Sequence, residues 1–412
     1  MRIQIILLTM VLGGAGFTSA QEPDTTVIPT DSAAAARADS IQLARDLAEL
    51  LGGVDGEQDP SAPATGPINP RLLPDISVVG DLVADMSPEG STQEDGGRFS
   101  VREVEVAFQA VVDPYFRGTL FLGFSDAEGA AVEQATLTTT ALPYGLQATL
   151  GRFLMPVGKL NNSHRHSLHT LDYPYVVQQF LGEEGLKGTG VEISRIFAPF
   201  GYYQELLVTV VDGVGETDDD LVTATPANRR LSGLGYSARL RNYWDISENT
   251  NVELSGSILT GERARALEIP GSPVNAANAR QTIFGGDITF RWRPLRQALY
   301  KSFLFRAEYL HQVNEDDPLF ESPLADRNGA YVFGRYQLTR RLFVGSRYDW
   351  VSEPVVGDAD LHAGSAYLEF YPSEFSKLLT TAERVFPAFG DPYNRLVFQA
   401  TFALGPHKPH PF

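Results

Sequence analysis

Three of the chain's seven histidines fall within one stretch of six residues. They are His164, His166 and His169, in the segment LNNSHRHSLHTLDYPY at positions 160–175. Imidazole binds zinc or copper, acts as a base in hydrolases, and changes charge near about pH 6.5. The stretch is therefore open to three interpretations: a metal site, a catalytic base, or the lining of a passage.

Each interpretation makes a different use of the neighbouring residues. A metal site would take the three imidazoles as ligands, although their spacing matches no standard zinc motif. A hydrolase would need Ser163, Ser167 or Asp172 in a fixed geometry, which a sequence does not give. As a lining, the histidines and Arg165 make a mildly basic, pH-sensitive constriction, and this is the interpretation that we prefer. Polar loop residues without a role are the remaining alternative.

The elements that position these residues follow from a regular pattern that begins at about residue 75. In the segment 103–112, Val104 and Val106 share one face, while Glu103 and Glu105 share the other. Alternation with this period predicts a β-strand that has one apolar face. The pattern recurs in sixteen segments: 75–86, 100–113, 115–125, 130–141, 144–153, 186–197, 202–213, 230–242, 249–260, 281–293, 302–314, 329–340, 342–352, 362–372, 378–386 and 393–404.

The connections between these segments alternate in length. An even number of strands, with short turns at one end and long loops at the other, is typical of outer-membrane barrels. A soluble β-sandwich is the alternative, but its strands average only about five or six residues. The longer segments favour an all-β, antiparallel transmembrane β-barrel of about 16 strands. The long loops are 154–185, 214–229, 261–280, 315–328 and 353–361.

The residues before the barrel predict export. Residues 1–20 have one charge, an apolar run and a small-residue end, which is typical of a signal peptide. Residues 21–70 read as a periplasmic part, with a short amphipathic helix at about 33–51 and a linker rich in Gly and Pro. The barrel then takes residues 71–412. The net charge of −18 argues against nucleic acid, and the lack of cysteine excludes thiolate metal sites.

With the apolar faces toward lipid, the polar faces line the lumen. The lumen side then holds nine arginines and seven acids. An arginine-rich wall attracts anions, but opposite charges on adjacent strands also pair with each other, so both interpretations stay open. The arginines are Arg117, Arg239, Arg241, Arg291, Arg293, Arg306, Arg335, Arg347 and Arg395, and the acids are Glu103, Glu105, Glu253, Asp287, Glu308, Asp349 and Glu369.

One region resembles a known family. The segment GRFLMPVGKLNNSHRHSLHTLDYPYVVQQFLGEEGLKGTGVEIS, residues 151–194, has a strand with a Gly-Arg-Phe pattern, a P-x-G turn and a long loop. It is similar to the loop region of the phosphate-selective porin O and P family. The chain also ends on an aromatic residue, Phe412, as outer-membrane barrels often do. The resemblance implies a porin whose loop 154–185 narrows the lumen.

We therefore expect an outer-membrane porin of a Gram-negative-type bacterium, which is not an enzyme, has no cofactor, and passes small polar or anionic solutes. The alternatives are a closed structural or adhesive barrel and a pore for zinc uptake. The expected partners are outer-membrane lipid and the solutes, and the N-terminal helix either joins three barrels into a homotrimer or folds into one lumen. The expected constriction consists of His164, Arg165, His166 and His169, and its three histidines are also the candidate metal ligands. The residues expected to line the pore are Arg117, Arg239, Arg241, Arg291, Arg306, Glu308, Arg335, Arg347 and Asp349.

Overall fold

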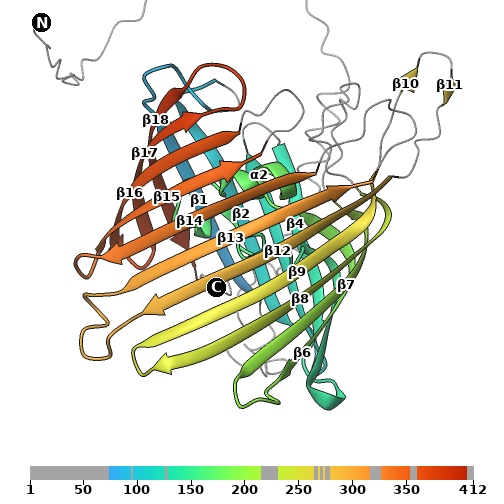
Figure 1. The fold of residues 1–412 in the computed structure, drawn as a ribbon. Helices are drawn as coiled ribbons and strands as arrows, with labels where there is room; N and C mark the ends of the chain where they lie inside the picture. Colours follow the sequence, from blue (N-terminus) through green and yellow to red (C-terminus); the bar gives the residue numbers. More distant parts are fainter. Residues whose placement is uncertain are drawn as a thin grey trace, which may run out of the picture. The chain divides into compact units, whose positions relative to one another are not determined.

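The alternating segments form a closed β-barrel (Figure 1). The computed structural model describes residues 74–93, 96–125, 129–214, 231–263, 268–269, 272–273, 279–315, 326–352 and 360–405. The expected signal peptide, the helix and linker of 21–70, and Phe412 lie outside these residues. In the part of the chain that is described, no helix is both long and apolar enough to cross a membrane.

Sixteen strands make the wall of the barrel, and neighbouring strands pair in antiparallel fashion, which confirms the predicted fold class. Two further short strands, β10 (Glu268–Ile269) and β11 (Ser272–Pro273), form a separate sheet. The wall strands are β1 (Asp75–Asp85), β2 (Phe99–Val111), β3 (Phe116–Ser125), β4 (Gly129–Thr139), β5 (Leu146–Leu154), β6 (Lys187–Phe197), β7 (Tyr203–Val214), β8 (Leu231–Ser247), β9 (Thr250–Arg263), β12 (Ala279–Trp292), β13 (Phe303–Asn314), β14 (Arg327–Gln337), β15 (Leu342–Val351), β16 (Leu361–Ser373), β17 (Ser376–Phe386) and β18 (Tyr393–Leu404).

The barrel closes where its first and last strands meet. β1 pairs with β18, with Val78 opposite Leu404 and Ala84 opposite Phe398. A closed ring of strands pairs the backbone groups of the wall internally, which a lipid environment requires because lipid offers no hydrogen-bonding partner.

Burial alternates along most of the strands, as the two-residue period of β-structure requires. In β16, for example, Ser365, Tyr367 and Glu369 are buried, whereas Leu368 and Phe370 between and beyond them are exposed. The outer face is thus apolar and the inner face carries charge, which is the reverse of a soluble protein and suits a wall surrounded by lipid.

Two strands extend three or more residues beyond their predicted ends. β8 and β9 were expected to stop at residues 242 and 260 but continue to Ser247 and Arg263. Their ladder persists through Asp245, which pairs with Asn251, because the turn between the strands is short. Polar and aromatic residues interrupt the alternation there, so the pattern alone ends too early.

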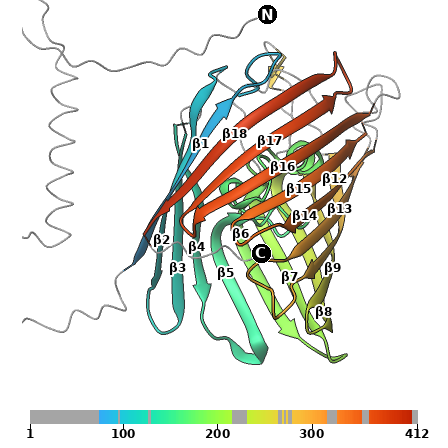
Figure 2. The same ribbon diagram turned by 90° about the vertical axis from the view of Figure 1, so that its left-hand side faces the viewer.

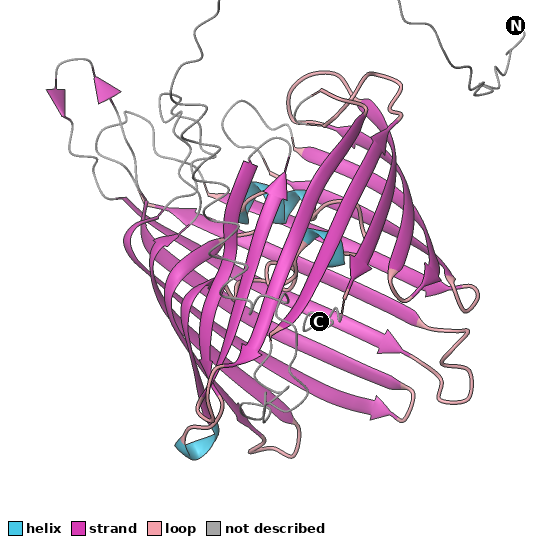
Figure 3. Ribbon diagram, turned by 180° about the vertical axis from the view of Figure 1, so that it is seen from behind, coloured by secondary structure: helices cyan, strands magenta, loops and turns pink. Residues whose placement is uncertain are grey.

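The connection between β5 and β6, residues 155–186, lies inside the barrel, and we call it the inner loop (Figures 2 and 3). It contains a 3-10 turn, η3 (Arg165–Ser167), and a helix, α2 (Tyr175–Leu181); a second 3-10 turn, η2 (Pro143–Gly145), precedes β5. The apolar run of the loop packs on the wall as α2, whose Val176, Val177, Phe180 and Leu181 are buried. These residues form one cluster with wall residues that include Val211, Tyr331 and Val397. The inner loop therefore has an apolar core that the wall completes.

Candidate functional site

The first residues of the inner loop are held by β9 and β13. Gly158 has a φ of +65°, and its N–H donates to Ser257 Oγ at 3.0 Å. The N–H of Lys159 donates to Glu308 Oε1 at 3.0 Å. Lys159 Nζ lies 2.8 and 2.9 Å from the two carboxylate oxygens of Glu253. Burial lowers the pKa of Lys159 to about 8, although the charge of Glu253 opposes that effect.

Asn161 joins the two ends of the inner loop. Its Nδ2 donates to the carbonyls of Met155 at 2.7 Å and Leu186 at 3.0 Å, and its Oδ1 accepts from the N–H of Leu186 at 2.7 Å. The side chain thereby satisfies backbone groups that would otherwise be buried without partners. These hydrogen bonds lie directly beyond the last pair of the β5–β6 ladder, Leu154 with Lys187.

The three histidines of the inner loop do not meet at one point. His164 Nδ1 lies 2.7 Å from Glu105 Oε2 on β2. His166 Nε2 lies 3.9 Å from the other oxygen of the same carboxylate. His169 faces another part of the wall, where its Nδ1 lies 3.7 Å from Glu369 Oε2 on β16. The structure thus brings together two of the three candidate metal ligands and separates the third from them.

Their surroundings change how these histidines titrate. Burial of His164 favours the neutral ring, but the charge and hydrogen bond of Glu105, together with the charges of Glu103 and Glu133, outweigh this effect and raise its pKa above the ordinary 6.5. Burial of His169, together with the positive charge of Arg335, lowers its pKa to about 4. His169 is therefore neutral between about pH 5 and 8, the range in which an unperturbed histidine changes charge. The constriction was expected to become more positive in acid through all of its histidines, but His169 does not contribute to this change above about pH 5.

Arg165 and Asp172 make ion pairs on the same side of the barrel. Arg165 Nη2 lies 3.4 Å from Glu184 Oε1, within the loop itself. Asp172 contacts two wall strands, because its carboxylate lies 2.8 Å from Arg102 on β2 and 3.1 Å from Arg395 on β18. These strands are the two neighbours of β1, so Asp172 connects both sides of the closure of the barrel.

The later part of the inner loop is bound by β15 and β17. The N–H of Tyr175, at the start of α2, donates to Asp349 Oδ1 at 3.1 Å. Lys377 Nζ donates to the carbonyls of His166 at 2.9 Å and Leu168 at 2.8 Å. A charged ammonium group thus fixes the backbone of the histidine segment itself.

Most of the arginines that were expected along the lumen form ion pairs. Their full positive charge is therefore not presented to a solute, which favours pairing over anion attraction as the main role of these side chains. Of the other three, Arg306 lies beside His169 in a small cavity, and Arg117 and Arg293 are exposed. The pairs are Arg239 with Asp287 at 3.0 Å, Arg241 with Glu205 at 2.7 Å, Arg291 with Glu253 at 3.4 Å, Arg335 with Glu369 at 2.6 Å, Arg347 with Asp349 at 2.6 Å, and Arg395 with Glu383 at 2.9 Å.

Several residues that hold the inner loop were not identified from the sequence. They are Arg102, Asn161 and Lys377, while Asp172 was considered only as part of a hydrolase. Lys377 lies just before the predicted strand 378–386, and extending that strand back by alternation would have placed it on the lumen side with Leu379. Asn161 gives no comparable signal, because its partners are set by the folded loop.

The fold and the inward loop define a β-barrel of the outer-membrane porin type. The chain is similar to OmpF of Salmonella typhi in complex with daunomycin (9% identity, TM-score 0.53) and to OprB of Pseudomonas putida (10%, 0.53). It is also similar to the outer membrane channel DcaP of Acinetobacter baumannii (13%, 0.52). Each likeness covers 80% of this chain and 97%, 94% and 96%, respectively, of the other. These likenesses agree with the expected β-barrel fold.

No family model matches the chain. A protein of Aquifex aeolicus (strain VF5), described as uncharacterized, is 30% identical to it over 343 residues, which cover 76% of this chain and 70% of that protein. The chain belongs to the same family as this Aquifex aeolicus protein.

Proposed function

We propose that the protein is an outer-membrane channel that passes small polar or anionic solutes, with the inner loop as its constriction. The observation that carries this proposal is the attachment of the loop by polar contacts to β2, β9, β13, β15, β17 and β18. A barrel of sixteen strands is wide enough for an aqueous channel. A loop fixed inside such a barrel therefore determines the width and charge of the passage. We assign the constriction to Arg165, His164, His166 and His169.

Selectivity follows from the charges that remain near the loop. Arg165 is partly exposed, at 18%, and its partner Glu184 is equally so. We expect a modest preference for anions, because the wall arginines are mostly paired. Selectivity for phosphate, which the resemblance to the porin O and P family implies, is the finer form of this proposal.

Single-channel recording of the folded full chain in planar bilayers tests the proposal. We expect stepwise conductance and a reversal potential in a salt gradient that indicates anion preference. Arg165→Gln should lower the anion-to-cation permeability ratio severalfold, whereas Arg296→Gln, at an exposed turn, should not. Phosphate added as a competing anion tests the finer proposal. Equal ratios for the two variants would contradict the assigned constriction.

A closed barrel with a structural or adhesive role is the second candidate, and the burial of the inner loop favours it. Within residues 155–186, Glu183 alone is exposed. A loop so completely covered leaves little surface for solutes in this conformation. A folded barrel without conductance under any salt or pH condition would support this candidate over the channel.

The homotrimer is a separate proposal, and it concerns the unit in which the barrel works. Chemical crosslinking of the protein in membranes, compared with a variant lacking residues 33–51, tests it. Trimers that persist in the full chain and disappear in the variant would support the helix as the connecting element. Monomers in both would leave each barrel as an independent unit.

A further inference from the structure

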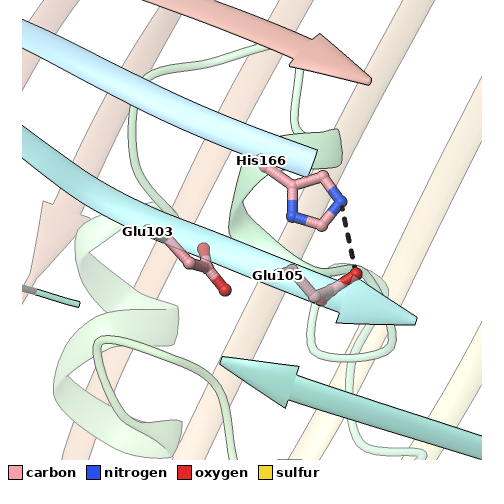
Figure 4. Close-up of side chains that lie close together, drawn as sticks. All are labelled: Glu103, Glu105 and His166. Atoms are coloured by element: carbon pink, nitrogen blue, oxygen red, sulfur yellow. Dashed lines mark ion pairs between the residues drawn. The ribbon is translucent and has the colours of Figure 1, made fainter. Parts of the chain in front are cut away.

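Two carboxylates and an imidazole gather where the inner loop meets the wall (Figure 4). Glu103 and Glu105 stand two residues apart on β2 and therefore project from the same face of the strand. His166 comes from η3 of the inner loop. One potential ligand atom from each of the three lies within 4.8 Å of the other two. Glu105 and His166 are only 1% and 4% exposed.

We propose that this cluster binds a divalent transition-metal ion, with zinc as the ion of choice, through Glu103, Glu105 and His166. Zinc takes imidazole nitrogen and carboxylate oxygen at about 2.0–2.2 Å, so that ligand atoms around it lie about 3.3 Å apart. His166 Nε2 and Glu105 Oε1 are 3.9 Å apart, as the dashed line in Figure 4 marks. A side-chain movement of about half an ångström therefore brings this pair to the distance that zinc requires.

The charges at the site favour a cation. Two neighbouring carboxylates in a buried position repel each other, and a divalent ion between them removes that repulsion. Arg165, next to His166 in the chain, lies 3.4 Å from Glu184 and also interacts with Glu103, so it neutralises only part of the negative charge of the two glutamates of β2. The binding of the His166 carbonyl by Lys377 at 2.9 Å holds the loop backbone in place.

His164 supports the same site. Its Nδ1 lies 2.7 Å from Glu105 Oε2, and its ring centre lies 5.7 Å from that of His166. A hydrogen bond from an imidazole orients the carboxylate that binds the ion, and such partners raise metal affinity.

This donor set differs from the three histidines that the sequence indicated. His169 is stacked on Phe333, with its ring centre 6.5 Å away, and contacts Glu369 instead. Since two ligands belong to β2 and one to the inner loop, a bound ion joins the loop to the wall. Metal binding at this position stands whether or not the barrel conducts, and it would restrict movement of the loop in either case.

Isothermal titration of the metal-free, detergent-solubilised full chain with zinc chloride tests the proposal. We expect one saturable site with a dissociation constant in the micromolar range or below, and weak or absent binding of Mg²⁺, which prefers all-oxygen ligands. His166→Ala and Glu103→Gln should each weaken zinc binding at least tenfold. His169→Ala changes the same residue type in the same loop and should bind zinc as the unchanged protein does.

The heat-dependent shift of folded barrels on gels identifies variants that fail to fold, and X-ray absorption at the zinc edge gives the ligands directly. A spectrum with one or two imidazoles and carboxylate oxygens near about 2.0–2.2 Å supports the site. The absence of saturable zinc binding would overturn the proposal. So would binding that persists at full strength in folded His166→Ala, or binding that is lost in His169→Ala but kept in the other variants.

Discussion

Replacing Asp172 with asparagine measures how strongly the inner loop is held. Asp172→Asn keeps the shape of the side chain and removes its charge. Both arginine partners of Asp172 keep another carboxylate in this variant. Arg102 remains 2.6 Å from Asp81, and Arg395 remains 2.9 Å from Glu383. The variant therefore reports the attraction lost by Asp172 rather than the cost of a buried arginine left alone.

The titration of Asp172 gives the size of that attraction. Burial favours the neutral acid, but Arg395 and Arg102 outweigh it and lower the pKa from 3.8 to about 2. The ionised form thus stabilises the closed loop above pH 3.8, and this contribution is lost as the pH falls through about 2. The difference corresponds to about 2–3 kcal/mol. Because the side chain is 22% exposed, we take about 2 kcal/mol, or roughly a 30-fold change in the opening equilibrium of the loop.

Hydrogen exchange of the backbone amides, followed by mass spectrometry at neutral pH, measures this opening. In Asp172→Asn the amides of residues 160–180 should exchange roughly 30-fold faster, while those of the wall strands stay unchanged. Glu183→Gln removes the same charge from the exposed acid of the same loop and serves as the control. Exchange that differs between the two variants by less than about threefold would refute the reasoning. The difference should also shrink as the pH is lowered from about 4 toward 2.

Three further predictions concern other contacts of the inner loop. Glu253→Gln leaves the buried Lys159 without its carboxylate partner. The backbone amides near Lys159 should then exchange faster by a factor equivalent to about 3 kcal/mol. An unchanged exchange rate would contradict a buried ion pair. Gly158→Ala adds a methyl group at φ +65° and against Glu308, and should lower the thermal unfolding temperature. His169→Gln should leave the pH dependence of ion selectivity between about pH 5 and 8 unchanged, because its pKa of about 4 keeps it neutral. A dependence lost in that variant would show that His169 titrates.

The strands of the barrel could be predicted because their signal is local. Alternation requires only the chain itself, and in β13 it correctly assigns Arg306 and Glu308 to the inner face. The contacts of the inner loop could not be predicted in the same way. Which acid lies beside His164, and which beside His169, depends on how a loop of irregular backbone folds against strands distant in sequence.

Arg102 is an instructive failure of the alternating pattern. Glu103 was placed on the lumen side. If the alternation were unbroken, the side chain of Arg102, the preceding residue, would face the lipid. The register between β1 and β2 shifts, however, since Asp81 lies opposite Glu103 whereas Leu82 lies opposite Val101. The extra residue is Arg102, and this β-bulge turns its side chain inward to the carboxylate of Asp81 at 2.6 Å. Because of this one irregular residue, the ion pair between Arg102 and Asp81 could not be predicted from the alternating pattern.

The position of Asp172 across the closure of the barrel has a consequence for folding. The two strands that meet there are distant in the chain, as in the hydrogen bond between Gln399 and Asp81, which are 318 positions apart. Contacts of such high sequence separation form late and slowly. Since Arg102 and Arg395 flank β1 on its two sides, Asp172 reaches both only after the first and last strands have paired. The contacts of Asp172 with both strands are therefore completed only when the ring closes, whereas the contacts of the inner loop with β9, β13, β15 and β17 do not depend on the closure.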